Sequence, residues 1–204
     1  MRSLQKHSID VKYDSNIFNA DIMCFTETQL LPNSNDSEII TNLYPFVLYR
    51  QDHVSDRYSS LAVCSNTNQH IKEHNYFPQI NAIKFVVANN KMPKCLTLLL
   101  LYRKHGSSIS QYLNSIGYIL NNNKIDIILG DFNINYLNDD VQPLKLLMES
   151  LSYTQTVQTP TFISTGSLLD HVYVTNEILT SIETFTVNVY FSDHDGIRIT
   201  LDLQ

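Results

Sequence analysis

The sequence predicts an α/β or α+β domain in which one β-sheet packs on another and helices lie outside. Two observations support this fold class. Short apolar runs bounded by polar turn residues recur along the chain, whereas few stretches repeat apolar residues at helical spacing. Several runs are also apolar at nearly every position, as in CLTLLLLY, and strands of that kind are buried on both faces. Such strands need a further layer on each side, so we expect sheet against sheet with helices outside.

The first half of the chain reads mainly as strands. Apolar residues from Ile9 to Phe18 predict a helix within 7–19. The Asn-rich stretch 33–38 follows Pro32 and is expected to form an exposed loop. Strands are expected at 21–27, 44–50, 58–65, 80–89 and 94–103, with a turn at 89–93 between the last two.

The second half of the chain contains two clear helical patterns and further strands. Apolar residues recur at spacings of three, four and seven after Ser107 and Ser108, and either serine can cap that helix. A second helix at roughly 141–151 has Pro143 in its first turn. Strands are expected at 127–129, where Gly130 ends the run, and at 187–191 and 197–203, where apolar residues alternate.

Length, charge and cysteine content limit the function classes. The chain has 204 residues, of which 43% are hydrophobic, and this suits one globular domain spanning 1–204. Its formal net charge of −6 argues against a general nucleic-acid-binding protein, because phosphate binding depends on cations. Cys24, Cys64 and Cys95 lie in apolar runs and are expected to be buried, reduced thiols. With no secretory signal or membrane-spanning run in view, an intracellular location, nucleus or cytoplasm, is expected.

Five points at which polar residues border an apolar run form the candidate site. An acid at a strand end is usually a turn former or a helix cap, so each point alone says little. Asp131 and Asn133 in particular can be read as an Asx-turn residue and a left-handed turn residue. Strand ends of one sandwich can nevertheless converge on a common edge. The residues at the five points are Glu27, Tyr102 with Arg103, Asp131 with Asn133, Asp170, and Asp193 with His194.

The order of these motifs resembles the endonuclease/exonuclease/phosphatase family. The matching stretches are CFTETQL, LLLYRKHG, ILGDFNINY, SLLDHVYVTN and YFSDHDGI, and the resemblance covers nearly the whole chain. It is greatest to the endonuclease domains of non-LTR retrotransposons and of some Helitron-like elements. It implies a four-layer αββα sandwich with two mixed, largely antiparallel sheets. It also implies cleavage of phosphate esters that depends on Mg²⁺, with Mn²⁺ as the alternative metal.

The resemblance assigns the metal and the proton handling to four residues. Glu27 is implied as the main metal ligand, and Asp193 as a second acid near the metal. His194 is implied as a proton-handling residue, which suits a side chain whose ordinary pKa is near neutrality. The resemblance implies that its carboxylate partner is Asp170 rather than the adjacent Asp193. The alternation of side chains along an extended segment agrees in part, since neighbours would point apart.

The remaining roles concern the substrate. Asp131 and Asn133 are expected to face one side of an extended segment, with Phe132 turned into the core. The resemblance places Asp131 by the attacking water or the leaving group and Asn133 on a phosphate oxygen. Tyr102 should donate to the phosphate or to Asp131, and Arg103 is either a substrate contact or a structural salt-bridge residue. Whether Asp131 or the His194–Asp170 pair is the general base is left open.

One departure from the family pattern concerns the N-terminus. The family usually has an Asn at the end of its first strand, just before a segment like RSL, whereas Met1 directly precedes Arg2 here. We therefore expect the first strand and its Asn to be lacking, so that the domain is N-terminally truncated. Magnesium-dependent nicking should then be weaker than in a version extended by that strand.

Three functions are compatible with these residues. The leading hypothesis is a DNA-nicking endonuclease of mobile-element origin that leaves a 3′ hydroxyl. A phosphatase or phospholipase of the same fold is the second, and the net charge of −6 favours it. An inactive relic that keeps only the fold is the third. A former fusion to a reverse transcriptase or a helicase is left open, and no membrane partner is expected.

Overall fold

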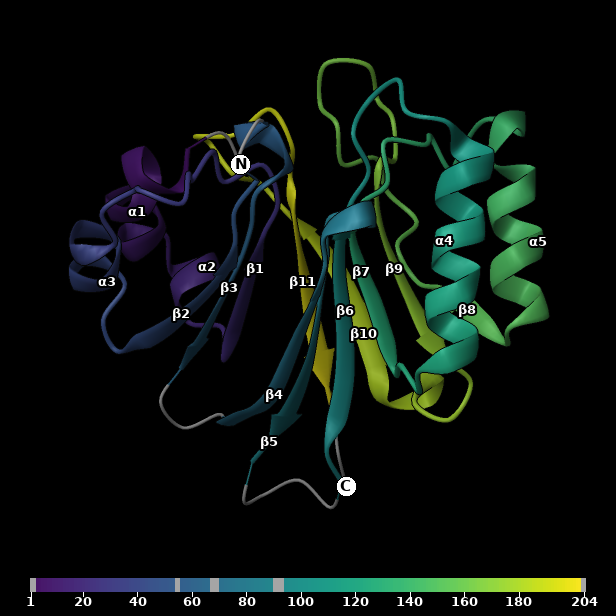
Figure 1. The fold of residues 1–204 in the computed structure, drawn as a ribbon, viewed down its shortest axis with the longest axis horizontal. Helices are drawn as coiled ribbons and strands as arrows, with labels where there is room; N and C mark the ends of the chain where they lie inside the picture. Colours follow the sequence, from purple (N-terminus) through teal and green to yellow (C-terminus); the bar gives the residue numbers. More distant parts are fainter. Residues whose placement is uncertain (1–2, 54–55, 67–69, 90–93, 203–204) are drawn as a thin grey trace.

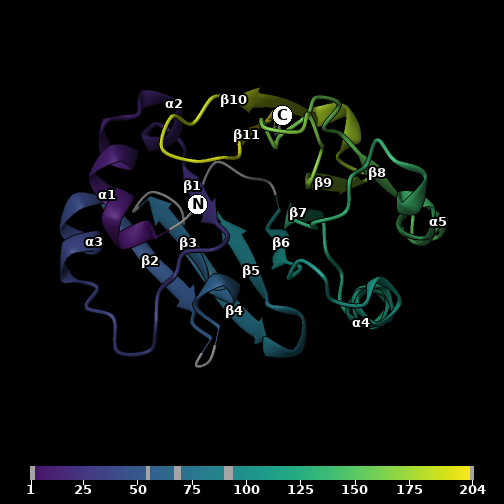
Figure 2. The same cartoon turned by 90° about the horizontal axis from the view of Figure 1, so that it is seen from above.

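Two layers of β-sheet face each other in the computed structural model, and helices cover both outer faces (Figures 1 and 2). The structure describes residues 3–53, 56–66, 70–89 and 94–202. An apolar core lies between the sheets, and a separate core lies under each helical layer. The expected αββα arrangement is therefore confirmed.

A six-stranded sheet forms one layer, in the order β4-β5-β6-β7-β9-β8. Strands β6 and β7 are parallel, and helix α4 (Ile109–Asn122) lies in the crossover between them, because parallel neighbours need a long connection. All other neighbours are antiparallel. The strands are β4 (His70–Phe77), β5 (Ala82–Ala88), β6 (Leu96–Tyr102), β7 (Ile127–Asp131), β8 (Tyr153–Gln155) and β9 (Asp170–Thr175).

The facing layer consists of a three-stranded and a two-stranded sheet. The three-stranded sheet has the order β1-β3-β2, and β10 pairs with β11 in the two-stranded sheet. Both are antiparallel, so the parallel pairing among the described strands lies in the six-stranded sheet. Among the described strands, β1 pairs only with β3 and β11 only with β10. The strands are β1 (Ile22–Phe25), β2 (Phe46–Gln51), β3 (Leu61–Asn66), β10 (Ile182–Val187) and β11 (Gly196–Leu201).

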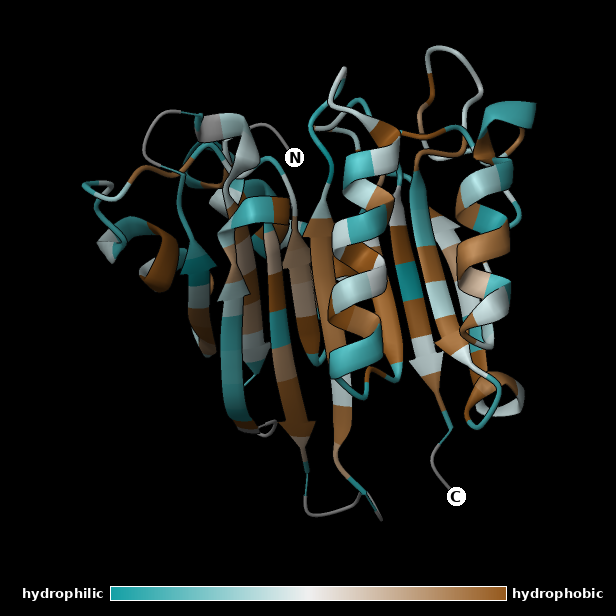
Figure 3. Ribbon diagram, turned by 45° about the vertical axis from the view of Figure 1, so that its right-hand side comes forward, coloured by the Kyte–Doolittle hydropathy of each residue, from teal (hydrophilic) through white to brown (hydrophobic). Residues whose placement is uncertain are grey.

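Helices α4 and α5 (Gln142–Ser150) cover the outer face of the six-stranded sheet, as the sequence predicts. The Ser108 hydroxyl caps α4 by accepting from the amide of Gln111. The buried side of α4 includes Leu113 and Ile116, and Figure 3 shows largely brown strands behind a helix with many teal and white positions. No helix in the part of the chain that the structure describes has the length and apolar character of a membrane span.

Three short helices cover the three-stranded sheet: α1 (Leu4–Tyr13), α2 (Ser15–Phe18) and α3 (Ser37–Asn42). The single helix expected within 7–19 is thus divided at Asp14, whose carboxylate accepts from the amide of Asn16 and starts α2. Helix α3 begins inside the stretch expected to be a loop, where only 33–36 is non-helical. Four 3₁₀ turns, η1 (Arg57–Ser59), η2 (Pro78–Ile80), η3 (Asp139–Val141) and η4 (Leu179–Ser181), connect other elements.

Several expectations about the strands need correction. Strand β4 was not expected, and β10 ends at Val187, so that residues 188–191 belong to a loop. The expected turn at 89–93 lies outside the described residues except for Asn89.

All three cysteines are free, but Cys95 is exposed because it precedes the first residue of β6, and Cys24 is only partly buried.

Gly130 lies within β7 instead of ending it. It pairs with Leu101 on one side and His171 on the other, at a φ of 139°. A Cβ atom at this position would lie 1.9 Å from the carbonyl oxygen of Leu101. Only glycine therefore lets the strand continue to Asp131 at this close approach of two backbones.

Replacing Gly130 by alanine should destabilise the protein by about 3 kcal/mol, because backbone atoms of β6 and β7 must move apart. Gly106→Ala is the matched control, since Gly106 also has a positive φ, of 77°, but has no atom within 4 Å of the added Cβ. The control should lose only about 1 kcal/mol. Urea denaturation measures both, and equal losses would contradict the packing argument.

Candidate active site

A histidine and a carboxylate form the centre of the candidate site. His194 Nδ1 lies 2.7 Å from Asp170 Oδ2. Asp170 is the first residue of β9, and His194 lies in the loop that leads into β11. Burial of the imidazole opposes its protonation, but the hydrogen bond and charge of Asp170 outweigh this and raise the pKa of His194. The structure thus pairs His194 with Asp170, the partner that the resemblance implies.

Asp131 lies beside this pair. It is the last residue of β7 and stands opposite Asp170 in the antiparallel register with β9. One ligand atom each from Asp131, Asp170 and His194 lie within 4.8 Å of one another. Burial, followed by the charge of Asp170, raises the pKa of Asp131 well above its ordinary value. The three groups thus form a compact cluster that links the two layers of the sandwich.

Asp131 and Asn133 do not belong to one extended segment, so the expectation that they face one side of it was wrong. The φ of Asn133 is 47°, so the backbone turns, and its amide N–H donates to Asp131 Oδ1 at 2.8 Å. Its side-chain Nδ2 also donates, to Asp131 Oδ2 at 3.1 Å and to the carbonyl of Arg103 at 2.8 Å. The alternative interpretation as an Asx turn is therefore confirmed. Phe132 between them is fully buried, as expected.

Glu27 joins the site through Tyr102. The hydroxyl of Tyr102, the last residue of β6, donates to Glu27 Oε1 at 2.6 Å. Burial and the charge of Glu27 raise the pKa of this hydroxyl, so it stays a donor. Its partner in the structure is thus Glu27, not Asp131. Glu27 follows β1 with a φ of 52°, so its carboxylate comes from the facing layer.

Arg103 supports the loop that carries Asn133. Its side chain is 5% exposed, and Nη1 donates to the Asn133 carbonyl at 2.9 Å. Nη2 donates to the carbonyl of Ser107. These contacts are with backbone carbonyls, so neither the expected salt bridge nor a direct substrate contact is supported by the geometry.

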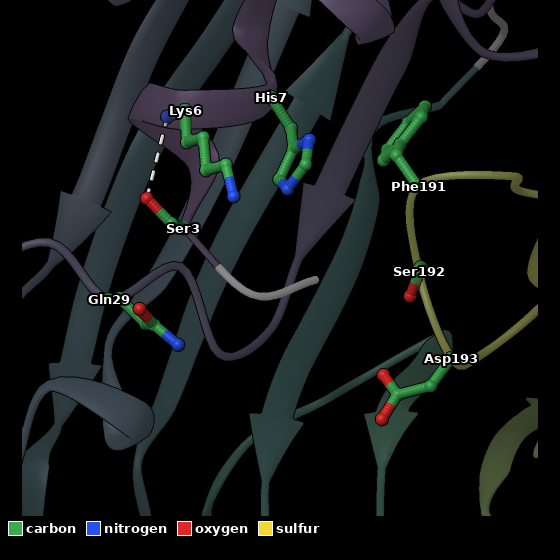
Figure 4. A pocket seen from close by; sticks show the side chains of 7 residues that line it. All are labelled: Ser3, Lys6, His7, Gln29, Phe191, Ser192 and Asp193. Atoms are coloured by element: carbon green, nitrogen blue, oxygen red, sulfur yellow. Dashed lines mark hydrogen bonds between the residues drawn. The ribbon is translucent and has the colours of Figure 1, made fainter.

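Asp193 is exposed and is not a member of this cluster. It lines a shallow cavity of about 360 Å³ at the edge of the site, opposite α1 (Figure 4). The other lining residues are Ser3, Lys6, His7, Gln29, Phe191 and Ser192. The ring of His7 stacks on Phe191 at 5.5 Å between ring centroids, which connects α1 to the loop that carries His194.

The donor set fits a hard divalent cation. Carboxylate oxygens are the ligands that Mg²⁺ prefers, and three carboxylates, from Glu27, Asp131 and Asp170, belong to this site. The charge of Asp170 helps to raise the pKa of Asp131, and a cation would relieve that repulsion. The cluster of Asp131, Asp170 and His194 differs from the ligand pair implied by the sequence, Glu27 and Asp193.

Two residues near the histidine were not singled out in the sequence. Thr161 is fully buried and contacts the backbone of Asp170, and the ring of Phe162 lies 4.9 Å from that of His194. They come from an irregular loop that pairs with distant residues, and no local pattern indicates such pairing.

His171 next to Asp170 is a core residue. It is fully buried and stacks on Phe132 at 4.6 Å. Its Nε2–H donates to the carbonyls of Ile134 and Leu168, and the Tyr173 hydroxyl donates to Nδ1. Burial lowers the pKa of His171 from 6.5 to about 4.

The buried neutral His171 should make the protein sensitive to acid. Because the folded-state pKa is the lower one, its contribution is complete above pH 6.5 and is lost as the pH falls towards 4, by about 3 kcal/mol in total. His171→Gln keeps a donor but cannot titrate. Urea denaturation between pH 7 and pH 5 should show a flatter pH dependence for this variant, and parallel curves would contradict the assignment.

Fold and site define the class of this protein: an αββα sandwich with carboxylates and a histidine gathered where strands of both layers end. The model of the Endonuclease/Exonuclease/phosphatase family matches residues 4–194, so the chain belongs to that family. A search of curated proteins gave no match.

Solved structures with this fold have diverse activities. The endonuclease domain of TRAS1, a telomere-specific non-LTR retrotransposon, superposes with a TM-score of 0.76 and 17% identity, over 100% of this chain and 94% of that one. TDP2 of D. rerio in complex with a single-stranded DNA product gives a TM-score of 0.68 and 12% identity, covering 98% and 92%. A mannosyl-6-phosphatase of Bacteroides thetaiotaomicron gives 0.67 and 12%, covering 97% and 91%.

Proposed function

We propose that this protein is a divalent-metal-dependent phosphodiester hydrolase that nicks DNA and leaves a 3′ hydroxyl. The observation that supports it best is the cluster in which His194 pairs with Asp170 beside Asp131, opposite the Glu27–Tyr102 contact. Hydrolysis of a phosphodiester needs charge neutralisation, an activated water and a stabilised leaving oxygen, and this cluster offers a group for each.

His194 is suited to hold the phosphate. Its raised pKa favours the imidazolium near neutral pH, and Asp170 fixes the ring through Nδ1. The imidazolium then binds a non-bridging oxygen and stabilises the charge that develops there. Asn133 holds the Asp131 carboxylate in place through two hydrogen bonds.

Asp131 is suited to accept the proton of the attacking water. Burial and Asp170 make its carboxylate more basic than usual, which improves a general base near neutral pH. This assignment chooses between the two bases that the sequence leaves open. A bound Mg²⁺ would supply charge neutralisation for the phosphate and the leaving oxygen, and Glu27 would hold it, while Asp131 accepts the proton and Asp170 orients His194.

Conversion of supercoiled plasmid to the open circle tests the proposal. We expect nicking with Mg²⁺ or Mn²⁺ and none after chelation. The nicked ends should act as primers for a DNA polymerase, because they carry a 3′ hydroxyl. Absence of nicking at millimolar metal would overturn the nuclease assignment.

A second candidate is a phosphatase or phospholipase acting on a small or lipid phosphate ester. The net charge of −6 favours it, since a DNA-binding surface is usually cationic. Phosphate release from an inositol phosphate or hydrolysis of a phospholipid, without plasmid nicking, would support this candidate. A relic that keeps only the fold would show neither activity and no heat of magnesium binding in calorimetry.

The proposed function includes an origin of this domain in a mobile element. The similarity to the TRAS1 endonuclease domain over the whole chain supports it, as do the sequence stretches that resemble such domains. A former fusion to a reverse transcriptase or a helicase, and action in the nucleus, belong to the same proposal.

A further inference from the structure

The loop before β9 contacts both members of the His194–Asp170 pair. Thr161 is fully buried, and its Oγ1 accepts from the amides of Leu169 at 3.2 Å and Asp170 at 3.1 Å. These bonds fix the backbone at which the Asp170 side chain begins. The Thr161 hydroxyl thus holds the backbone amide of Asp170, the residue whose carboxylate orients His194.

The same loop also holds the histidine segment. The amide of Asp195 donates to the carbonyl of Thr161 at 2.7 Å, and Phe162 forms an isolated β-bridge with His194. The ring of Phe162 packs on the imidazole at 4.9 Å and an interplanar angle of 53°. The Leu169–Asp170 segment and the His194–Asp195 segment are therefore both bound to one dipeptide, Thr161–Phe162.

The loop is itself closed by backbone bonds. Phe162 and Ser167 exchange hydrogen bonds of 2.8 and 3.3 Å, and Gly166 between them has a φ of 66°, which suits a tight turn. The loop can therefore transmit the position of β9 to His194.

We propose that Thr161 and Phe162 are positioning residues that hold His194 and Asp170 in the geometry required for turnover, an inference that rests on the proposed hydrolase function. They touch neither substrate nor metal in this assignment. Their effect passes through the hydrogen bond between His194 and Asp170, for which displacements near 1 Å are costly.

The test compares variants that differ in one hydroxyl. Thr161→Val keeps the shape and removes Oγ1, whereas Thr161→Ser keeps Oγ1. Nicking kinetics at saturating Mg²⁺ should show kcat lowered about thirtyfold in Thr161→Val with KM within about twofold, and recovery to within about threefold in Thr161→Ser. Thr159→Val is the matched control, since the Thr159 hydroxyl bonds to Thr186 on the protein surface, and its kcat should be unchanged.

A spectroscopic measurement keeps the test independent of activity. In the metal-free protein, the proton NMR resonance of the imidazole N–H that faces Asp170 should move upfield or vanish in Thr161→Val and persist in Thr161→Ser and Thr159→Val. If the wild type proves inactive, the proposed hydrolase function is wrong. The resonance still shows whether Thr161 positions the His194–Asp170 pair. Phe162→Leu, which keeps the hydroxyl and removes the ring, should show the same shift and serves if Thr161→Val does not fold.

Two results would overturn the inference. One is an unchanged resonance, with kcat within twofold of the wild type, in both Thr161→Val and Phe162→Leu. The other is an equal loss in Thr161→Val and Thr161→Ser, which would indicate a role in packing alone.

Discussion

His194→Ala should lower the nicking rate roughly a thousandfold. The substitution removes the group that we expect to carry positive charge towards the phosphate, and such acid–base and electrostatic contributions are typically a hundredfold to ten-thousandfold. The loss should lie in kcat, because the charge is needed most in the transition state. Initial rates on supercoiled plasmid at saturating Mg²⁺ measure it.

The control for His194→Ala is His74→Ala. His74 is exposed on β4, at the edge of the six-stranded sheet, and packs on Tyr49 and Tyr76. Its replacement should leave nicking within about twofold of the wild type, as is usual for surface substitutions away from a site. Equal rates for the two variants would remove His194 from the mechanism.

Glu27→Gln should raise the Mg²⁺ concentration needed for half-maximal nicking and lower the maximal rate at least about a hundredfold. The amide oxygen can still accept from Tyr102, so the contact at 2.6 Å is kept while the charge is lost. Rates measured over a magnesium series, together with calorimetric titration of Mg²⁺, give both quantities.

The control for Glu27→Gln is Glu183→Gln. Glu183 is exposed on β10, and its substitution makes the same change of net charge without touching the site. Its magnesium dependence should match the wild type. If Glu27→Gln also keeps the wild-type dependence, Glu27 is not a metal ligand, and the cluster of Asp131, Asp170 and His194 becomes the sole candidate.

The sequence was sufficient to predict a helix or strand where the local pattern of apolar residues agrees with the tertiary structure. Helices α4 and α5 follow their apolar spacing, and the strand containing Leu98 is buried on both faces as its composition predicts. Strand β4 was missed because its middle residues are polar and exposed. A bulge between Ile71 and Glu73 also shifts the alternation of its side chains.

The site was predictable in its residues and less so in their geometry. The pairing of His194 with Asp170 followed from a family resemblance, whereas the spacing of Asp131 and Asn133 suggested an extended segment. The positive φ of Asn133 reverses that geometry, and a turn of this kind depends on hydrogen bonds that compete with strand pairing. The contacts of Thr161 are between segments far apart in the chain, which one sequence does not reveal.

Glu27 and His194 are carried by different pieces of one layer. Glu27 follows β1, His194 precedes β11, and no described strand lies between these two edges. A cation or phosphate held by both would act as a cross-link across this seam, next to side-chain packing such as that of His7 on Phe191. Binding to the folded form alone stabilises a protein by mass action. Here the protection against amide exchange should concentrate along β1 and β11, the two strands on either side of the seam.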